Sequence, residues 1–399
     1  MRMSINRKFT RRDFFEIGGI VAFGLIAKRQ TSSQSKKTSK EMLLYVGTYT
    51  TAGSEGIYVF TLNTITGQLN KIHAIEDVVE PSFLAIGKSR KYLYAVNETE
   101  TYEGKQSGAV SAFAINQKTG SLEFLNKQPS MGGAPCHIST SDSEKFVLVA
   151  NYLGGNVAVF PTEDSGKLGE PVEVIQHSGS GPDKERQGSP HPHSIILSKD
   201  NRFAFVADLG ADKVFIYQFD DRTGKLKPNP SQNYYQTKAG AGPRHFKFHP
   251  NGELAFLINE LNSTITSFAF DKRKVILKEI QTVPTLPVNF SGANSCADIH
   301  IAPNGKFLYG SNRGHDSLVI YAVEQRTGEM KYVGHVSTEG KKPRNFAISP
   351  DGKTLLAANQ NSDSIIVFSV NEKTGMLKQT KNNAKVSMPV CLKLIPLFA

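Results

Sequence analysis

The sequence predicts an all-β protein, a seven-bladed β-propeller that is closed by its own last strand. Two observations lead to this prediction. Apolar and polar residues alternate with a period of two along many short segments, as they do in β-strands. A unit of several strands also recurs, and its second strand ends on Asn or Asp at Asn97, Asn151, Asp208, Asn259, Asn312 and Asn359. Intervals of 47 to 57 residues are close to the blade repeats of propellers, in which each blade holds four short strands.

The flanking elements of the repeat recur as regularly. The first strand of most copies opens on a proline, at Pro81, Pro135, Pro192, Pro243 and Pro343. Turns of the type Pro-Asn-Gly or Pro-Asp-Gly join the first two strands in several copies, and a Thr-Gly or Ser-Gly turn closes nearly all of them. Such turns connect adjacent antiparallel strands. Each copy is therefore expected to be one antiparallel sheet.

The first and last copies complete each other. The segment LLYVGTYT, residues 43–50, starts a blade over residues 43–70 that lacks an opening strand. The chain end supplies one, because SMPVCLKLIP, residues 387–396, matches the opening segment GAPCHISTS of another copy. We expect this terminal strand to pair into the first blade, which closes the ring and removes an exposed sheet edge.

The basic charge of the chain is concentrated before the repeats. The formal net charge is +11, and residues 1–40 hold ten Lys and Arg but only two acids. The remaining body is close to neutral, which argues against a nucleic-acid-binding protein.

The three cysteines, Cys136, Cys296 and Cys391, form no metal-binding spacing and no disulfide framework, so we interpret them as buried apolar residues.

The first residues resemble an export signal. The pair Arg11-Arg12 is followed by two aromatic residues and by the apolar run 17–27, whose 11 residues are too few to span a bilayer. This layout is similar to a twin-arginine signal, which predicts an exported, periplasmic protein without a stable membrane span. A leader that does not function would leave the protein in the cytoplasm. The predicted organisation is a leader over residues 1–30, a polar linker over 31–41 and the propeller over 42–399.

Candidate site residues occupy two positions of the repeat that vary from blade to blade. Equivalent positions of a propeller form rings around its central channel. The residue after the opening proline is Ser82, Cys136, His193, Arg244 and Arg344 in different copies, and the residue after the strand-ending Asn or Asp is Tyr49, Glu98, Tyr152, Leu209, Glu260, Arg313 and Gln360. Arginines that converge with a His and a Glu repel one another unless they bind an anion. We therefore predict that His193, Arg244, Glu260, Arg313 and Arg344 bind an anionic small molecule, the alternative being a merely solvated polar channel.

The next residue of the opening strand forms a second set, in which His245 and Asp298 are the titratable members of two neighbouring blades. Because side chains alternate along a strand, a buried hydrogen-bonding role between blades competes here with contact to a substrate. The repeated Asn and Asp residues are expected to satisfy loop backbone groups. The segment HPH at residues 191–193 has no third ligand nearby in the sequence, and we expect neither a metal nor a cofactor.

Three segments carry a family likeness: GAGPRHFKFHPNGELAFLINELNS, ADIHIAPNGKFLYGSNR and KPRNFAISPDGKTLLAANQ. They resemble the bacterial lactonase family of seven-bladed propellers, which includes propeller-type 6-phosphogluconolactonases and is related to carboxymuconate cyclases. The resemblance covers about residues 42–397 and implies a lactonase whose active-site set is His193, Arg244, Glu260 and Arg313. The phosphorylated lactone is made in the cytoplasm, so an unphosphorylated aldonolactone is the alternative substrate for an exported protein.

Lactone hydrolysis needs an activated water molecule and a stabilised oxyanion. In our hypothesis His193 is the general base and Glu260 holds it or orients the water, although these two roles are interchangeable. Arg244 or Arg313 would face the oxyanion, and we expect Arg244 to pack little. The remaining predicted substrate contacts are Arg344, His245, Asp298 and Tyr49, with Lys342 beside Arg344. A lactonising isomerase and a non-enzymatic binding propeller stay open as alternatives, and we expect a monomer.

Overall fold

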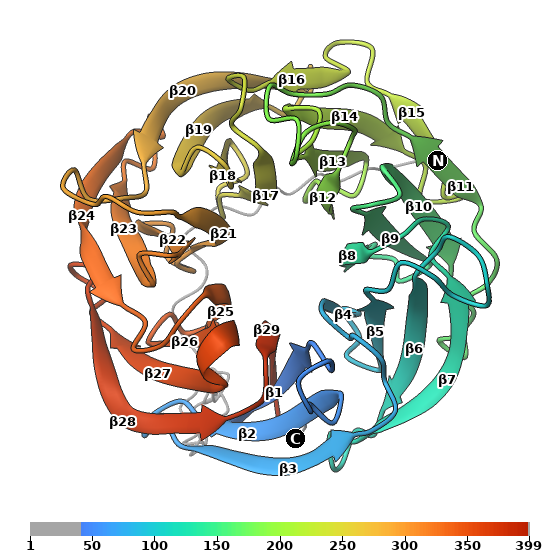
Figure 1. Ribbon diagram of the computed structural model, residues 1–399, viewed down its shortest axis with the longest axis horizontal. Coiled ribbons are helices and arrows are strands. Elements are labelled where there is room, and N and C mark those ends of the chain that lie inside the picture. Colours follow the sequence, from blue (N-terminus) through green and yellow to red (C-terminus); the bar gives the residue numbers. More distant parts are fainter. Residues whose placement is uncertain (1–40, 398–399) are drawn as a thin grey trace, which may run out of the picture. The chain divides into compact units, whose positions relative to one another are not determined.

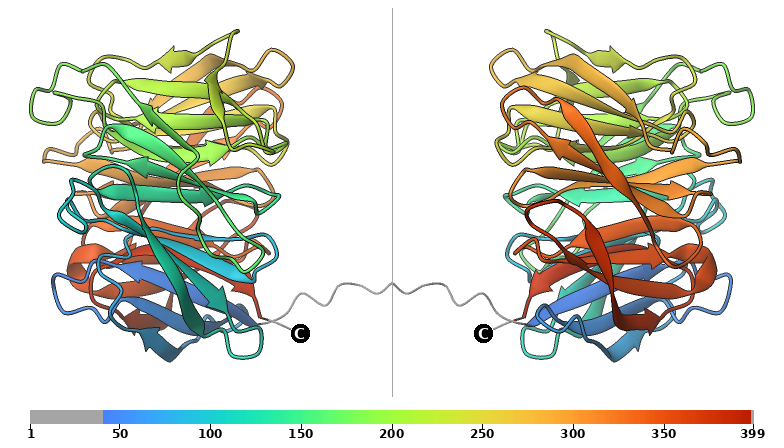
Figure 2. Two further views of the ribbon diagram at one scale, coloured as in Figure 1. Left: turned by 90° about the vertical axis from the view of Figure 1, so that its right-hand side faces the viewer. Right: turned by 90° about the vertical axis from the view of Figure 1, so that its left-hand side faces the viewer.

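The computed structural model describes residues 41–397, and the predicted leader and most of the linker lie outside them. The described chain folds into seven antiparallel sheets around a channel (Figure 1), which confirms the predicted propeller. Two side views show the twist of the strands within each blade (Figure 2). The single helix among the described residues is the short 3-10 turn η1 (Gln360–Ser362). No helix within residues 41–397 is long and apolar enough to cross a membrane.

The first three blades follow in chain order. Blade 1 contains β29 (Pro389–Pro396), β1 (Glu41–Thr48), β2 (Ile57–Asn63) and β3 (Leu69–Ile75). Blade 2 contains β4 (Leu84–Ile86), β5 (Tyr92–Asn97), β6 (Ala109–Ile115) and β7 (Leu122–Pro129). Blade 3 contains β8 (Pro135–Thr140), β9 (Phe146–Asn151), β10 (Asn156–Pro161) and β11 (Glu173–Gln176).

Four more blades complete the ring. Blade 4 contains β12 (Pro192–Leu197), β13 (Phe203–Asp208), β14 (Lys213–Phe219), β15 (Leu226–Pro228) and β16 (Tyr234–Gln236). Blade 5 contains β17 (Pro243–Phe248), β18 (Leu254–Asn259), β19 (Thr264–Asp271) and β20 (Ile276–Pro284). Blade 6 contains β21 (Ser295–Ile301), β22 (Phe307–Arg313), β23 (Ser317–Val323) and β24 (Met330–Ser337). Blade 7 contains β25 (Pro343–Ile348), β26 (Thr354–Asn359), β27 (Ser364–Val370) and β28 (Leu377–Lys385).

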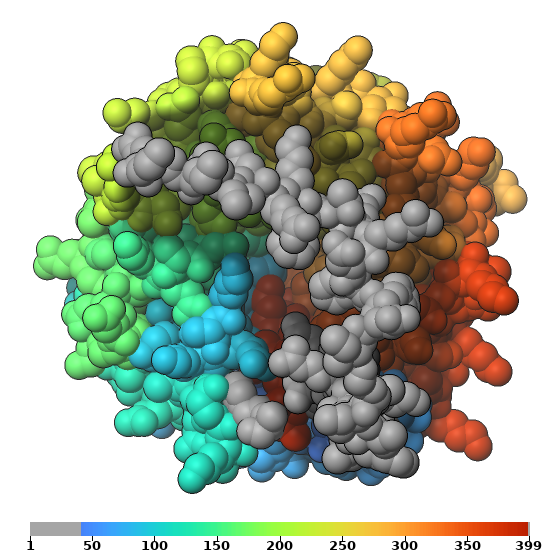
Figure 3. All heavy atoms as spheres, turned by 180° about the vertical axis from the view of Figure 1, so that it is seen from behind, coloured from blue at the N-terminus to red at the C-terminus, as the bar shows by residue number. Residues whose placement is uncertain are grey.

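The ring closes as the sequence predicts. Strand β29 pairs antiparallel with β1, from Met42 opposite Pro396 to Thr48 opposite Pro389. Seen from behind, the atoms of successive blades follow the sequence order around the molecule (Figure 3). Because the innermost strand of blade 1 comes from the chain end, the inner edge of β1 is paired and the first and last repeats join into one ring.

The cores lie between blades. The second strand of most blades is buried along nearly its whole length, as in β9 and β18, where all six residues are buried. One cluster joins Leu43 and Cys391 of blade 1 to Leu84 and Phe113 of blade 2. A sheet that buries both faces depends on its neighbours, so no blade is stable alone. The described cysteines are all buried and free, as predicted.

Five of the six recurrent Asn and Asp residues have the structural role that was predicted. Asn259 differs, because its Nδ2 donates to the hydroxyls of Thr264 and Thr266 at 2.9 and 3.3 Å. The Nδ2 atoms of Asn97, Asn151, Asn312 and Asn359 each donate to a backbone carbonyl of the loop before the blade, at 2.6 to 2.9 Å. Asp208 does the reverse, because its Oδ1 accepts the backbone N–H of His191 at 2.7 Å. These side chains fix the loops that precede the innermost strands.

Candidate functional site

A β-bulge presents the first candidate ring to the channel. In blades 3, 4, 5 and 7 the pairing of the innermost strand slips by one residue directly after the opening proline. One residue in each of these blades is left out of the pairing. It is Cys136 in blade 3, His193 in blade 4, Arg244 in blade 5 and Arg344 in blade 7. A bulge re-aims a side chain without ending the strand, and a proline fits this first position because it has no N–H to donate.

The second candidate ring is held by one repeated hydrogen bond. The residue after the last Asn or Asp of the second strand, or after Thr48 in blade 1, donates its backbone N–H to the carbonyl that precedes the opening proline. This bond recurs in six blades, from Tyr49, Glu98, Tyr152, Leu209, Glu260 and Gln360, at 2.7 to 3.1 Å. Both rings therefore lie at the same end of the innermost strands, which confirms that the two repeat positions meet in space.

Glu260 is the centre of an arginine cluster. Its Oε2 atom lies 2.9 Å from Arg244 Nε and 2.9 Å from Arg313 Nη2, and its Oε1 atom lies 2.7 Å from Arg186 Nη2. Burial alone would raise the pKa of Glu260, but the three guanidinium groups override it and lower this pKa to about 2. The carboxylate therefore stays ionised at neutral pH and holds three cations together.

Arg244 is more enclosed than the sequence led us to expect. Its exposed fraction is 2%, and its Nη1 atom lies 2.5 Å from the carbonyl oxygen of Ala297 and 3.3 Å from His245 Nε2. The expectation that Arg244 packs little was therefore wrong, because the bulge points its side chain toward blade 6. Burial, with the charges of Arg313 and Arg344, lowers the pKa of Arg244 to about 10, which leaves it charged at neutral pH.

Two arginines keep unused hydrogen-bonding capacity. Arg344 forms no ion pair with any carboxylate within residues 41–397 and lies over the ring of Tyr49, with its Cζ 5.4 Å from the ring centroid. Arg313 donates from Nη2 to the carbonyl of Cys296 at 2.8 Å, while its buried Nε has no partner among the described residues. Unsatisfied guanidinium donors at one channel mouth are suited to an anion or to a developing oxyanion.

His193 has surroundings that differ from our hypothesis. It forms no hydrogen bond with Glu260, and its Nδ1 lies 3.6 Å from the sulfur of Cys136. Its ring packs edge-on against Tyr152 and His245, with centroids 5.5 Å apart in both cases. Burial lowers the pKa of His193 well below its ordinary value, and the charges of Arg244, His245 and Arg344 lower it further. The imidazole is neutral at physiological pH and a weak base.

His245 and Asp298 form a bridge between blades. His245 Nδ1 lies 2.8 Å from Asp298 Oδ1, and His300 Nε2 lies 2.9 Å from Asp298 Oδ2. The Asn345 amide of blade 7 also donates to Asp298, at 2.5 Å. The exposed fractions of His245 and Asp298 are 3% and 1%, so the hydrogen-bonding role that we weighed against substrate contact is the one their geometry favours. Burial, assisted by Arg244, lowers the pKa of His245 to about 3.

Two members of the site were not predicted. Arg186 belongs to the long loop between β11 and β12, outside the repeat, so no pattern could identify it. Glu98 occupies the same ring position as Glu260, on blade 2, and this equivalence was the available signal. Its carboxylate accepts hydrogen bonds from Tyr49 Oη at 3.0 and 3.1 Å and from the Ser82 hydroxyl. Burial raises the pKa of Glu98 above its ordinary value, and Arg344 and the two hydroxyls offset only part of this effect.

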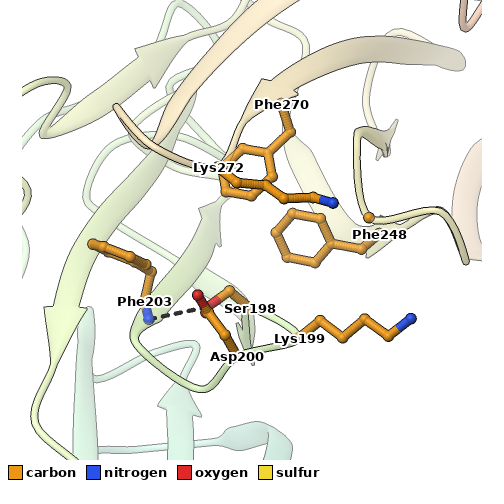
Figure 4. Close-up of a pocket in the computed structure, with 8 residues that line it drawn as sticks. Ser198, Lys199, Asp200, Phe203, Phe248, Phe270 and Lys272 are labelled. Atoms are coloured by element: carbon orange, nitrogen blue, oxygen red, sulfur yellow. Dashed lines mark hydrogen bonds between the residues drawn. The ribbon is translucent and has the colours of Figure 1, made fainter. Parts of the chain in front are cut away.

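A separate cavity of about 240 Å³ lies between blades 4 and 5 and includes Phe203, Phe248, Phe270 and Lys272 (Figure 4). The dashed line in this view is the hydrogen bond from the Phe203 backbone N–H to Ser198 Oγ, 3.1 Å long. The cavity adjoins the ends of β12 and β17, whereas the candidate residues lie at the beginnings of these strands. It is therefore not part of the candidate site.

Within residues 41–397 there is no group of three His, Cys, Asp or Glu residues that could hold a metal ion.

Comparison with known proteins gives one consistent result. Residues 43–394 match the profile of the family described as "Lactonase, 7-bladed beta-propeller". The 6-phosphogluconolactonase of Bacillus subtilis is 38% identical over 302 residues, which cover 76% of this chain and 83% of that protein. The 6-phosphogluconolactonase of Formosa agariphila is 35% identical over 308 residues, or 76% of this chain and 86% of that protein.

A solved structure agrees with these sequence relatives. The periplasmic gluconolactonase of Pseudomonas aeruginosa superimposes with a TM-score of 0.84 at 32% identity, over 90% of this chain and 99% of that one. The fold and the matched length agree with the resemblance found in the sequence. The chain belongs to the lactonase family of seven-bladed β-propellers.

Proposed function

We propose that this protein hydrolyses a sugar lactone to the corresponding aldonic acid. The observation that carries the proposal is the arginine cluster at the channel mouth, in which Glu260 holds Arg186, Arg244 and Arg313 together while Arg344 has no carboxylate partner among residues 41–397. Hydrolysis of a lactone develops negative charge on its carbonyl oxygen, and fixed cations beside that oxygen stabilise the transition state. The names of the family relatives support the same reaction.

The roles follow from which donors remain free. Arg313, with its unpartnered Nε, faces the oxyanion, and Glu260 keeps the guanidinium groups in place. Arg344 binds the phosphate or another anionic group of the substrate, with Tyr49 beneath it. His193 stays neutral and hydrogen-bonds the substrate, since its lowered pKa makes it a poor proton acceptor. Each role depends on groups fixed before the substrate arrives, which is what electrostatic stabilisation requires.

A panel of lactones tests the proposed reaction. Proton release is followed with 6-phosphogluconolactone, gluconolactone and a muconolactone, and each rate is corrected for spontaneous hydrolysis. We expect enzyme-dependent release with a sugar lactone. Activity with the muconolactone alone would favour a lactonising isomerase, and no activity with any of the three would favour a binding propeller and contradict the proposal.

The substitution Arg344→Met tests whether the substrate is anionic. If Arg344 binds a phosphate, we expect KM for 6-phosphogluconolactone to rise about 10- to 100-fold, because a charge-assisted hydrogen bond contributes roughly 1.5–3 kcal/mol. The KM for gluconolactone should change little. The matched control is Lys341→Met, which removes an exposed cation three residues earlier. Equal losses on both lactones would show that Arg344 does not bind the phosphate.

The location of the protein decides which lactone it meets. Replacing Arg11-Arg12 by two lysines keeps the charge but removes the paired guanidinium groups of a twin-arginine signal. We expect the variant to stay in the cytoplasm with unchanged lactonase activity, while the unaltered protein is found in the periplasm. Cell fractionation with activity assays measures both. An unaltered protein found wholly in the cytoplasm would contradict the export prediction and favour 6-phosphogluconolactone as substrate.

A further inference from the structure

We propose that Glu98 is the general base and acid of the lactonase reaction, an inference that rests on the proposed function. Glu98 directly follows β5 in blade 2, as Glu260 follows β18 in blade 5. Their backbone N–H groups make equivalent hydrogen bonds. Glu98 donates to the carbonyl oxygen of Glu80, and Glu260 donates to that of Gly242. The two carboxylates therefore occupy equivalent positions at the same channel mouth, and any difference between them comes from their surroundings.

The surroundings of the two carboxylates are opposite in kind. Both oxygens of Glu260 are occupied by guanidinium groups, which belong to Arg186 on one side and to Arg244 and Arg313 on the other. Glu98 forms no ion pair within the described chain. Its hydrogen-bond donors are the neutral hydroxyls of Tyr49 and Ser82. A carboxylate held by neutral donors can accept a proton far more readily than one held by three cations.

Glu98 is also the more accessible of the two. Its residue is partly exposed at the channel mouth, whereas the exposed fraction of Glu260 is 3% and that of His193 is 5%. The charges of Arg344 and Arg244 act on Glu98, so it belongs to the same cluster as the proposed anion-binding groups. A water molecule at the mouth can therefore reach both Glu98 and a lactone whose anionic group lies on Arg344.

The protonation of these groups separates their roles. Burial raises the pKa of Glu98, while the pKa of Glu260 is about 2 and that of His193 is lowered well below its ordinary value. Two carboxylates whose surroundings drive their pKa values apart are the usual arrangement of an acid–base catalyst and an electrostatic partner. The raised pKa makes Glu98 the readier proton acceptor of the two carboxylates, and Glu260 remains an anion.

The reaction balances with water as the only co-reactant. The water oxygen bonds to the lactone carbonyl carbon, one water proton moves to the Glu98 carboxylate, and the carbonyl electron pair forms the oxyanion beside Arg313. The oxyanion then collapses, the bond between the carbonyl carbon and the ring oxygen breaks, and the proton on Glu98 moves to that ring oxygen. Glu98 returns to its carboxylate form, and the product acid loses its proton to solvent.

The substitution Glu98→Gln tests the proposal, because glutamine keeps the size of the side chain and cannot accept the proton. We expect kcat to fall at least about 100-fold, with a KM within about threefold of the unaltered enzyme, because a residue that acts only in the transition state lowers kcat. In the unaltered enzyme kcat should rise with pH as Glu98 ionises, at a pH above the ordinary carboxyl range. This acid limb should be missing from the variant.

Ser82→Ala provides a second measurement. The Ser82 hydroxyl lowers the pKa of Glu98, so its removal should shift the acid limb of the kcat profile to higher pH. A Glu98 that only supports the fold would not produce this shift. If circular dichroism shows that Glu98→Gln does not fold, the test rests on the dependence of kcat on pH in Ser82→Ala. A profile whose acid limb lies at the same pH as in the unaltered enzyme would overturn the proposal.

The outcomes separate this proposal from the proposed function. If the unaltered protein hydrolyses a lactone and folded Glu98→Gln retains kcat and its pH profile, Glu98 is not the acid–base group, although the lactonase function stands. If the unaltered protein hydrolyses none of the lactones in the panel, the proposed function fails, and the proposal for Glu98 fails with it. The matched control is Glu55→Gln, a carboxylate with a side-chain exposure of 43%, which should leave kcat unchanged.

Discussion

A chain that ends at Met388 is expected not to form a stable monomeric propeller. The truncation removes β29, which pairs with β1 from Met42 to Thr48. It also removes Val390, Cys391, Leu392 and Ile395, all of them buried. Burial of one large apolar side chain contributes about 1.5–3 kcal/mol, so the loss is comparable to the total stability of a domain, roughly 5–15 kcal/mol. The unpaired inner edges of blade 1 would then favour association between chains.

Size-exclusion chromatography and thermal unfolding measure the effect. The matched control ends at Leu397, which keeps all of β29 and the hydrogen bond from the Leu397 N–H to the Glu41 carbonyl. We expect the control to elute and unfold as the full chain does, and the Met388 truncation to aggregate. A peptide of residues 386–397 added in trans should restore part of the folded material. A truncated chain that stays monomeric and unfolds at an unchanged temperature would contradict the role of β29.

The substitution Glu260→Gln is expected to abolish most activity and to destabilise the protein. It removes the carboxylate shared by Arg186, Arg244 and Arg313, and breaking a buried ion pair by removing one partner costs about 3–5 kcal/mol. The guanidinium groups would then repel one another beside the substrate. We expect kcat/KM to fall about 10³-fold, as it does when a preorganised electrostatic group is lost. A folded variant with near-normal kcat/KM would contradict the assignment of the cluster to the active site.

The pH dependence of stability gives an independent measurement of the same carboxylate. A pKa of about 2, against an ordinary value of 4.5, makes ionised Glu260 contribute about 3 kcal/mol to the free energy of unfolding. Because the folded-state pKa is lowered, this contribution is present above about pH 4.5 and is lost as the pH falls toward 2. Urea unfolding at a series of pH values should show the difference between the unaltered protein and Glu260→Gln shrinking over that range. A constant difference would mean that Glu260 is not held by the arginines in solution.

The sequence by itself determined the architecture. The recurrent proline, the strand-ending Asn or Asp and the Thr-Gly turns identified the blades, and the match of residues 387–396 to an opening strand identified the closure. These features are predictable because each blade is built from hydrogen bonds between neighbours in the sequence and repeats the same local chemistry. The two ring positions were also predictable, since equivalent positions of a repeat must lie at equivalent places around the channel.

Only the tertiary structure decided which side chains meet at the channel mouth. A bulge after the opening proline orients the side chains of His193, Arg244 and Arg344. No sequence pattern except the proline itself indicates this bulge. Arg186 comes from a loop outside the repeat, and its carboxylate partner lies 74 positions away. The pairing of Glu260 with arginines rather than with His193 depends on distances across several blades. Repeat patterns fix contacts within a blade, whereas contacts across the channel exist only once the ring has closed. These contacts include the arginines that lower the pKa of Glu260, while burial raises the pKa of Glu98.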